Sequence, residues 1–357
     1  MKYSTKMTVL LIAALAALLF GIGIGSVYMA PGDILAIILN HFFGTSLSET
    51  LPASYPAMVL NMRLPRVILA FFTGAALAIS GTVTQSILQN PLTSPFGLGI
   101  SSGAGLGAAT VIVFGLTATG PGTFLLPGVS LGFALITVFL VVLISSRLDS
   151  SVSNVTIILV GTVFFLFCNA VMNLMATSSP DYGERIQLWL MGSFSMKEWN
   201  AVWVLALATV FGLIFFLFHS RELDVMTFGE ESAQAMGVNL LKLKRILLAA
   251  IAALSGTAVA FVGIIGFVDL IVPHIIRRWF GAAHKKILPA SALFGGTFLV
   301  LCDLAARTLI PAREISIGAI TSLLGAPFFC ISFLQDAGID NLPMKQKWRL
   351  LCFELNI

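Results

Sequence analysis

The residue types that carry out chemistry in proteins are sparse in this chain, and their spacing matches no catalytic signature. It contains four histidines and four cysteines, and neither set has the spacing of a metal site or of a disulfide framework. The nucleotide-binding loop G-x-x-x-x-G-K-[ST] and the metalloprotease pattern H-E-x-x-H do not occur. We therefore predict that the chain is not an enzyme, with no catalytic residue, metal or cofactor of its own.

Three arginines are the most suggestive binding residues. Arg63 and Arg66 enclose a Leu-Pro pair at the start of one long apolar segment, and Arg307 lies at the end of another. Because arginine binds carboxylates through charge-assisted hydrogen bonds, these cations could bind acidic residues of a partner protein. The alternative is that they only anchor helix ends. Asp303 lies four residues before Arg307, so the two side chains share a helix face and we expect an ion pair.

The elements that position these residues must be membrane-spanning helices. Of the 357 residues, 58% are hydrophobic and only 10% are charged, whereas a soluble domain carries about 25% charged residues. A spanning helix needs about 20 apolar residues. We predict an all-α polytopic membrane protein, one domain over residues 1–357, with about ten helical segments. The segments are 9–29, 65–87, 96–116, 127–146, 155–176, 201–219, 246–262, 267–280, 288–306 and 315–334.

The lysines and arginines predict an orientation. With the N-terminus inside and the segments alternating, inner loops hold fourteen of the 20 Lys and Arg residues and outer loops hold the other six. Cytoplasmic loops are rich in these residues, so both termini are predicted to face the cytoplasm. The eighth segment contains Pro273 and is too short to cross in a straight line. Asp269 near its start is expected to act as an N-cap.

Residues 220–245 interrupt the apolar pattern. This connection holds two acidic clusters, ends in three cations and is longer than most connections between helices. Within it, residues 228–238 predict a short helix, because Glu230 and Glu231 favour a helix start and Gly237 is typical of a helix end. A polar platform held against a membrane could take up force from a soluble partner. The simpler alternative is a solvated helix at the membrane surface.

Seven short motifs occur in order along residues 60–335. They are Arg-Leu-Pro-Arg at 63–66, Leu-Ala-Ile-Ser-Gly at 77–81, Gln-Asn-Pro-Leu-Thr-Ser-Pro at 89–95, Leu-Gly-Ile-Ser-Ser-Gly at 98–103, Gly-Glu-Glu-Ser-Ala-Gln-Ala-Met-Gly-Val at 229–238, Gly-Phe-Val-Asp-Leu-Ile-Val-Pro-His at 266–274 and Gly-Ala-Ile-Thr-Ser-Leu-Leu-Gly-Ala-Pro-Phe-Phe at 318–329. In these motifs the chain resembles the permease subunits of ABC importers for iron siderophores, haem and vitamin B12, the FecCD type of type II importers. One departure is Asp269, where the family commonly has glycine.

The resemblance implies a type II permease fold of ten transmembrane helices, paired as a dimer around a central path in a bacterial or archaeal cytoplasmic (inner) membrane. The implied partners are two ABC ATPase subunits that bind ATP and Mg²⁺, an extracytoplasmic substrate-binding protein, a second permease copy in a homodimer, and membrane lipid. No nucleic acid is implied. The substrate is expected to be a ferric siderophore, with haem or vitamin B12 as alternatives. An ion-coupled secondary carrier is the alternative from a different class.

The resemblance also implies roles for particular residues. The docking residues for the binding protein are Arg63, Arg66 and Arg307. The residues that couple to the ATPase are Phe228, Gly229, Glu230, Glu231, Ala235, Met236, Gly237 and Val238. The cytoplasmic gate comprises Asn90, Leu92, Ser153 and Asn154. The outer part of the translocation path is lined by Met172, Asn173, Met175 and Ala176.

Overall fold

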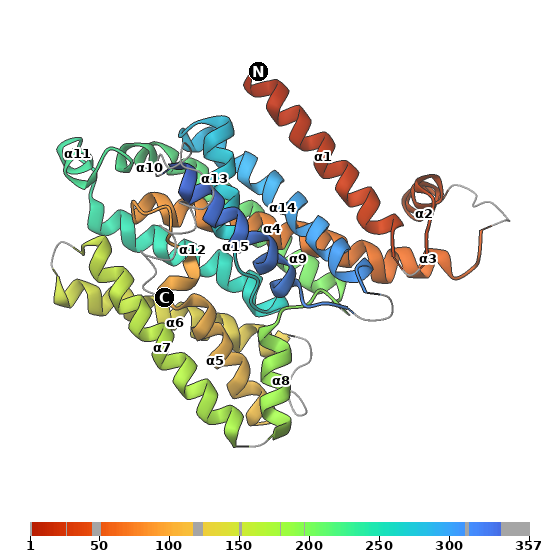
Figure 1. Cartoon of the computed structure of the whole chain (residues 1–357), viewed down its shortest axis with the longest axis horizontal. Coiled ribbons are helices and arrows are strands. Elements are labelled where there is room, and N and C mark those ends of the chain that lie inside the picture. Colours follow the sequence, from red (N-terminus) through yellow and green to blue (C-terminus); the bar gives the residue numbers. More distant parts are fainter. Residues whose placement is uncertain are drawn as a thin grey trace, which may run out of the picture.

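The computed structural model describes residues 2–25, 27–44, 51–116, 124–149, 152–178, 180–195, 197–310 and 314–336, which form helices joined by short connections (Figure 1). No strand occurs within these ranges. Seven helical stretches are long and apolar enough to cross a membrane. The predicted all-α membrane fold is therefore confirmed.

The ten predicted segments are all helical. The seven long stretches are α1 (Tyr3–Gly23), the continuous run of α3 (Tyr55–Met58), η1 (Val59–Arg63) and α4 (Leu64–Ile87), α6 (Leu125–Leu148), α7 (Asn154–Thr177), α9 (Trp199–Phe218), α12 (Leu240–Val262) and α14 (His284–Thr308). The other three are α5 (Ile100–Val113), α13 (Val268–Phe280) and α15 (Ile317–Asp336).

Five further helices lie between these segments. They are α2 (Pro31–Phe43), η2 (Pro95–Leu98), α8 (Pro180–Leu190), α10 (Ser220–Met226) and α11 (Glu230–Ala235). Only α11 was predicted from the sequence. Helix α2 is apolar but too short to span, η2 overlaps the start of the predicted segment 96–116, and α8 and α10 are short and mixed in composition. For example, α2 begins at a proline and ends at Gly44 in the left-handed conformation, after only 13 residues.

Helix α4 is the centre of the fold. In its most apolar window 83% of the residues are buried, against 28% in the windows of α7 and α9. A helix that is apolar on every side is stable only where other helices surround it. Accordingly, α4 packs against α9, α12, α13 and α14. The outer helices α7 and α9 leave much of their apolar surface for lipid or for another subunit.

Helices α4 and α14 cross where Gly74 faces Gly295. A Cβ atom on Gly74 would lie 2.1 Å from the carbonyl oxygen of Gly295, and one on Gly295 would lie 2.5 Å from the oxygen of Gly74. Small residues allow helix backbones to approach this closely in membranes. Gly74 and Gly295 therefore allow α4 and α14 to pack closely at this crossing.

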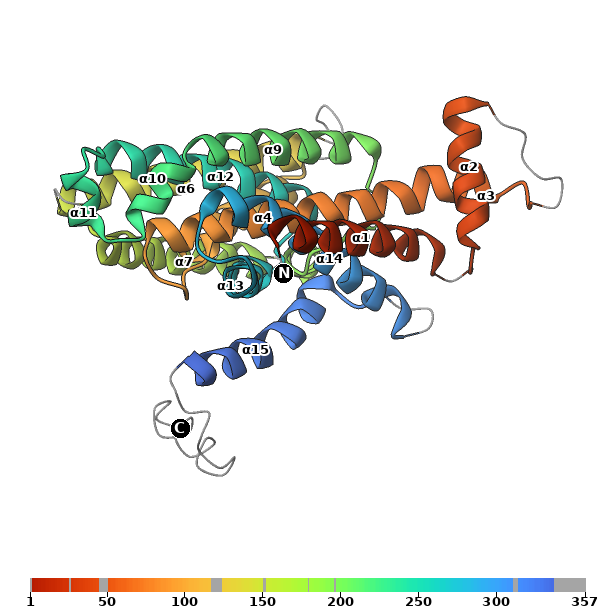
Figure 2. The ribbon, with the colours of Figure 1, turned by 90° about the horizontal axis from the view of Figure 1, so that it is seen from above.

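The helices form two groups, and the molecule has two distinct ends, one at each end of α4. Helices α5 to α8 lie together beside the group around α4 (Figure 1), and α12 packs against both groups. Figure 2 shows α4 running from the end with α2 and α3 to the end with α10 and α11. We call the first the arginine end, because it holds Arg63, Arg66 and Arg307, and the second the coupling end.

Candidate functional site

At the arginine end, Arg66 joins two acidic residues. Its Nη2 lies 2.8 Å from Asp303 Oδ1 and its Nη1 lies 2.7 Å from Glu314 Oε1. The Asp303 side chain is only 1% exposed, whereas Glu314 is 50% exposed. Ser195 donates a hydrogen bond to Glu314 and accepts one from Arg66 at 3.2 Å. The arrangement ties the start of α4 to the end of α14 and to the loop before α15.

The other two arginines bind backbone carbonyl groups. Arg63 is 7% exposed and donates to the carbonyl oxygens of Ile22 and Gly23, at 2.8 and 3.2 Å. Arg307 donates to the carbonyl of Gly21 at 2.7 Å, and its Nε lies 3.1 Å from Asp303 Oδ2. Helix C-termini leave carbonyl groups without intrahelical partners. The two guanidinium groups therefore hold the end of α1, and the predicted ion pair between Asp303 and Arg307 is confirmed.

The three arginines lie together, as the docking prediction requires, but their charges are not free. Arg63 is enclosed and bonded to carbonyl groups, so a partner would reach it only if α1 moved. Arg66 is the member closest to a partner, because its second carboxylate, Glu314, lies at the surface. Burial opposes ionisation of Glu314, but hydrogen bonds from Arg66 and Ser195 outweigh it and lower the pKa of this carboxyl. Docking itself stays a prediction.

At the coupling end, α11 has the predicted caps. Glu230 and Glu231 lie in its first turn, and Gly237 has a φ of +83° just after the last helical residues. The N–H of Gly237 donates to the carbonyl of Gln234 at 2.9 Å, and that of Val238 donates to the carbonyl of Ala233 at 3.0 Å. These two bonds form a Schellman motif, which needs the left-handed glycine.

An ion pair holds α11 against the membrane helices. Lys244 is 1% exposed, lies 2.8 Å from Glu230 Oε1 and donates to the carbonyl of Val152 at the same distance. A buried ammonium requires such partners. Glu230 therefore has a structural part as well as any role toward a partner, and the sequence alone did not show it.

Of the other seven predicted coupling residues, five are exposed, whereas Gly229 and Val238 are half-buried. Phe228 is 74% exposed and Met236 is 61% exposed, and Glu231, Ala235 and Gly237 also face outward. These residues lie on a polar stretch between the candidate spans α9 and α12. These two exposed apolar side chains are therefore candidates for contact with a partner, and the coupling role stays a prediction.

The predicted gate residues lie in a turn after α4 and at the start of α7. Asn90 Oδ1 accepts from the N–H of Leu92 at 2.9 Å, which closes a turn in residues 88–94, called the gate loop below. Leu92 is 48% exposed. Ser153 is the N-cap of α7 and accepts from the N–H of Thr156. Helix α7 packs against η2, which follows the gate loop. Asn154 begins α7, and the gate role of all four residues stays a prediction.

Asp269 does not cap its helix, which corrects the sequence analysis. The N-cap of α13 is Phe267, with a φ of +70°, and Asp269 lies inside the helix. The carboxylate is fully buried and accepts a hydrogen bond from Ser94 in the gate loop. Its backbone carbonyl would lie 2.0 Å from a Cβ atom on Gly81. Asp269 thus connects α13 to the gate loop.

The predicted path residues do not share one face of α7. Met172 is 3% exposed and its sulfur would lie 2.9 Å from a Cβ atom on Gly105, so this side chain packs against α5 and does not line an open surface. Met175 and Ala176 pack against the same small cluster of apolar residues. Asn173 alone of the four is exposed. Helix phase thus turns Met172 toward α5, and the path role of all four residues stays a prediction.

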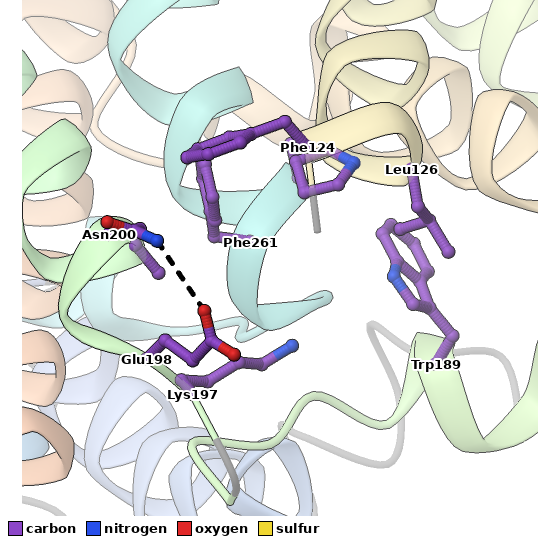
Figure 3. A pocket seen from close by; sticks show the side chains of 10 residues that line it. Phe124, Leu126, Trp189, Lys197, Glu198, Asn200 and Phe261 are labelled. Atoms are coloured by element: carbon purple, nitrogen blue, oxygen red, sulfur yellow. Dashed lines mark hydrogen bonds between the residues drawn. The ribbon is translucent and has the colours of Figure 1, made fainter. Parts of the chain in front are cut away.

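One pocket of about 260 Å³ lies between the ends of α6, α8, α9 and α12 (Figure 3). Phe124 and Phe261 meet edge to face there, with ring centroids 6.3 Å apart. Lys197 lies on the wall beside Glu198, and removal from water lowers the pKa of its ammonium. No cluster of three His, Cys, Asp or Glu side chains able to hold a metal occurs among the described residues.

An all-helical membrane bundle with a capped helix, α11, in the polar connection between α9 and α12 is the architecture expected of a transport permease. Comparisons with known proteins identify the family. Residues 10–335 match the FecCD transport family. The chain belongs to this family, whose members are permease subunits of ABC importers, and it is a multi-pass membrane protein.

Two relatives from Bacillus subtilis (strain 168) illustrate the match. The uncharacterized ABC transporter permease protein YvrB is 40% identical over 319 residues, covering 89% of this chain and 90% of that protein. The Fe(3+)-citrate import system permease protein YfmE is 35% identical over 327 residues, covering 90% and 93%. A solved metal-chelate type ABC transporter in an inward-facing conformation superposes with a TM-score of 0.79 at 29% identity, covering 91% of this chain and 97% of that one.

Proposed function

We propose that the chain is the transmembrane subunit of an ATP-driven importer that moves a ferric siderophore, or another bulky metal chelate, from a binding protein into the cytoplasm. Two copies pair around a central path in a bacterial or archaeal cytoplasmic membrane. Two ATPase subunits, with their ATP and Mg²⁺, bind the coupling end, and the binding protein docks at the arginine end. Both termini then lie in the cytoplasm.

The exposed apolar residues of the coupling region support this proposal most directly. Phe228 and Met236 project from a polar connection that no candidate span includes, so lipid is not their natural contact. Aromatic and methionine side chains are enriched in the centres of protein interfaces, with charged groups at the rim. Glu231 supplies such a rim charge, and the Schellman motif and the Glu230–Lys244 pair keep the helix in place.

The exposed face of α7 supports pairing with a second copy. Its members recur mostly every four residues along the helix and are Val155, Leu159, Val163, Phe167 and Leu174. Asn173 lies on the same exposed side of the helix end. For the substrate, the relative named for Fe(3+)-citrate import favours an iron chelate. Haem and vitamin B12 are the alternatives within the family.

An ion-coupled carrier is a second candidate, because one buried acid favours it. Asp269 is fully buried, and its Oδ1 has no hydrogen-bond partner among the described residues. Ionisable groups inside membrane proteins often belong to proton or ion paths. Asp303, the other buried acid, is fully engaged by Arg66 and Arg307 and gives this alternative no support.

Binding of the ATPase tests the proposed function. The substitutions Phe228→Ser and Glu231→Arg should each weaken association with the ATPase partner by about tenfold or more, since few central residues dominate an interface. Glu184→Arg on α8 is the matched control for the charge reversal, because Glu184 is exposed outside the coupling region. Unchanged affinity in both coupling variants would refute the assignment of this surface.

A further inference from the structure

A chain of hydrogen-bonded side chains runs inward from Asp224, whose side chain is 38% exposed and which lies on α10, the helix just before α11. Asp224 Oδ1 lies 2.8 Å from the backbone nitrogen of His284 and 2.6 Å from its Nδ1. On the other side of the ring, His284 Nε2 lies 2.6 Å from Ser86 Oγ. Arg277 donates to the same Ser86 oxygen at 2.8 Å and to the carbonyl of Thr82 at 3.0 Å.

The partners fix the orientation of the ring. A carboxylate only accepts hydrogen bonds, so Nδ1 of His284 carries the proton that Asp224 binds. In the neutral ring Nε2 is then an acceptor for the hydroxyl proton of Ser86, for which the carbonyl of Thr82 at 3.0 Å competes. His284 is fully buried and Ser86 is 3% exposed, and each ring nitrogen has a partner. Polar networks that are buried and fully bonded rigidify the elements they join.

The hydrogen-bonded chain of Asp224, His284 and Ser86 is not arranged for catalysis. Serine, histidine and aspartate form the triad of many hydrolases, but there the serine oxygen is free to attack a substrate. Here Ser86 is buried in the last turns of α4, and its oxygen accepts a hydrogen bond from Arg277. A structural connection between helices is the role that these contacts allow.

The same hydrogen-bonded residues join the coupling region, residues 220–245, to the gate loop. Asp224 lies on α10, six residues before α11 begins, and Ser86 lies one residue before the end of α4, where the gate loop follows. A second contact joins the same elements, because Gln89 Nε2 donates to the carbonyl of Met226, the last residue of α10, at 2.7 Å. Helix α10 also packs against α4 and α14. Thus α10 is bonded directly to Gln89, just after α4, and is connected to Ser86, just before the end of α4, through His284.

We propose that the Asp224–His284–Ser86 chain transmits displacement of the coupling region to the gate loop, with His284 as its central positioning residue. This inference rests on the proposed function, since it requires an ATPase that moves α11. When α11 and α10 shift, the hydrogen bonds carry the end of α4 with them, and the gate loop follows. Without the His284 side chain, the direct hydrogen bond between α10 and this end of α4 among the described residues is the one from Gln89 to Met226.

Hydrogen exchange of the full-length chain in lipid nanodiscs tests the inference without a transport substrate. The ATPase partner is added with a non-hydrolysable ATP analogue, and exchange is followed at residues 229–238 and 88–94. In the unaltered chain, ATPase binding should slow exchange at the first segment and change it at the second. In His284→Ala the slower exchange at 229–238 should persist. The change in exchange at 88–94 should fall by about fivefold, which corresponds to the net free energy of one hydrogen bond.

Three further variants sharpen the test. Asp224→Asn should keep the effect at 88–94, because its amide oxygen accepts the same two bonds. Thr308→Ala is the control on α14, since the Thr308 hydroxyl bonds only to the carbonyl of Leu304 in its own helix. If His284→Ala fails to fold, Ser86→Ala carries the test, because it removes a single hydroxyl.

The outcomes separate this inference from the proposed function. No ATPase-dependent protection at 229–238 in the unaltered chain would contradict the proposed function. Two results would overturn only the transmission through His284, provided that residues 229–238 are protected. One is that the unaltered chain shows no effect at 88–94. The other is that the effect at 88–94 survives in both His284→Ala and Ser86→Ala. Loss of the effect in these variants, with its retention in Asp224→Asn and Thr308→Ala, is the result that the inference predicts.

Discussion

Arg66 and Asp303 form a paired contact across two helices, with Arg66 Nη2 and Nε at 2.8 and 3.0 Å from Asp303 Oδ1. Asp303 also lies 3.1 Å from Arg307 Nε, so one buried carboxylate serves two guanidinium groups. Both arginines also have other partners. The arginine end is therefore organised around Asp303, and its arginines are mostly ion-paired or hydrogen-bonded to groups of the same polypeptide.

Removing this carboxylate should destabilise the protein strongly. Asp303→Ala leaves two largely buried cations without their shared partner, and we expect the free energy of unfolding to fall by about 3 kcal/mol. Asp303→Asn should have a smaller effect, because its amide oxygen still accepts a hydrogen bond. Unfolding of the purified chain in detergent, followed by circular dichroism, measures the difference. Equal stability of Asp303→Ala and the unaltered chain would contradict this account of the arginine end.

Glu314 should weaken docking of an acidic partner, because it competes for Arg66. Glu314→Gln removes the competing charge at the surface, and we expect tighter association with the binding protein at low salt. The gain should shrink at high salt, where exposed charges are screened. Titration of the binding protein at two salt concentrations checks this. An unchanged affinity at low salt would exclude Arg66 as a docking residue, and Arg63→Ala is the matched comparison, with no expected gain.

The crossing of α4 and α14 should not tolerate a methyl group. Gly74→Ala would place Cβ 2.1 Å from the carbonyl oxygen of Gly295. We expect the helices to separate, at a cost of about 2 kcal/mol, the usual size for overpacking. Gly128→Ala in α6 is the control, because a Cβ there meets nothing within 4 Å. Thermal melting of both variants decides the matter, and equal melting temperatures would show that the crossing is not closely packed.

Lys197 should react with amine reagents at lower pH than an ordinary lysine. Burial disfavours its charged form and lowers its pKa from the usual 10.5. A larger share of neutral, nucleophilic amine is then present at each pH below that value, and the cost of burying the charge disappears as pH rises. Acylation rates from mass spectrometry give the pH profile. The reference is a model lysine whose backbone groups are blocked and whose side-chain amine is free. A profile that coincides with the reference would contradict the burial of this amine.

The sequence predicted the ten helical segments because spanning helices need long apolar runs, which stand out in a chain with 10% charged residues. It also predicted the cap of α11 at Gly237 and the ion pair between Asp303 and Arg307, since both depend on residues a few positions apart. Helix phase was harder to obtain. Met172 and Asn173 are neighbours in the chain, but one packs inward and the other faces out.

Contacts between distant residues could not be predicted. Glu314 lies 248 residues from Arg66, and His284 lies 198 residues from Ser86. No local pattern connects such pairs, because the folded arrangement of α4 and α14 brings them together. Asp269 shows the same limit, since its position near the start of a short segment suggested a cap, while its partner Ser94 lies 175 residues away.

Uptake into proteoliposomes tests the central claim most directly. The chain is reconstituted with its ATPase and binding-protein partners, and accumulation of radiolabelled ferric siderophore, ferric citrate, haem and vitamin B12 is followed with ATP and, separately, with a proton gradient alone. The account predicts concentrative uptake of an iron chelate that requires ATP and the ATPase. Uphill uptake by the chain alone, driven by the gradient without ATP, would contradict it and would make Asp269 the leading candidate for the coupling group.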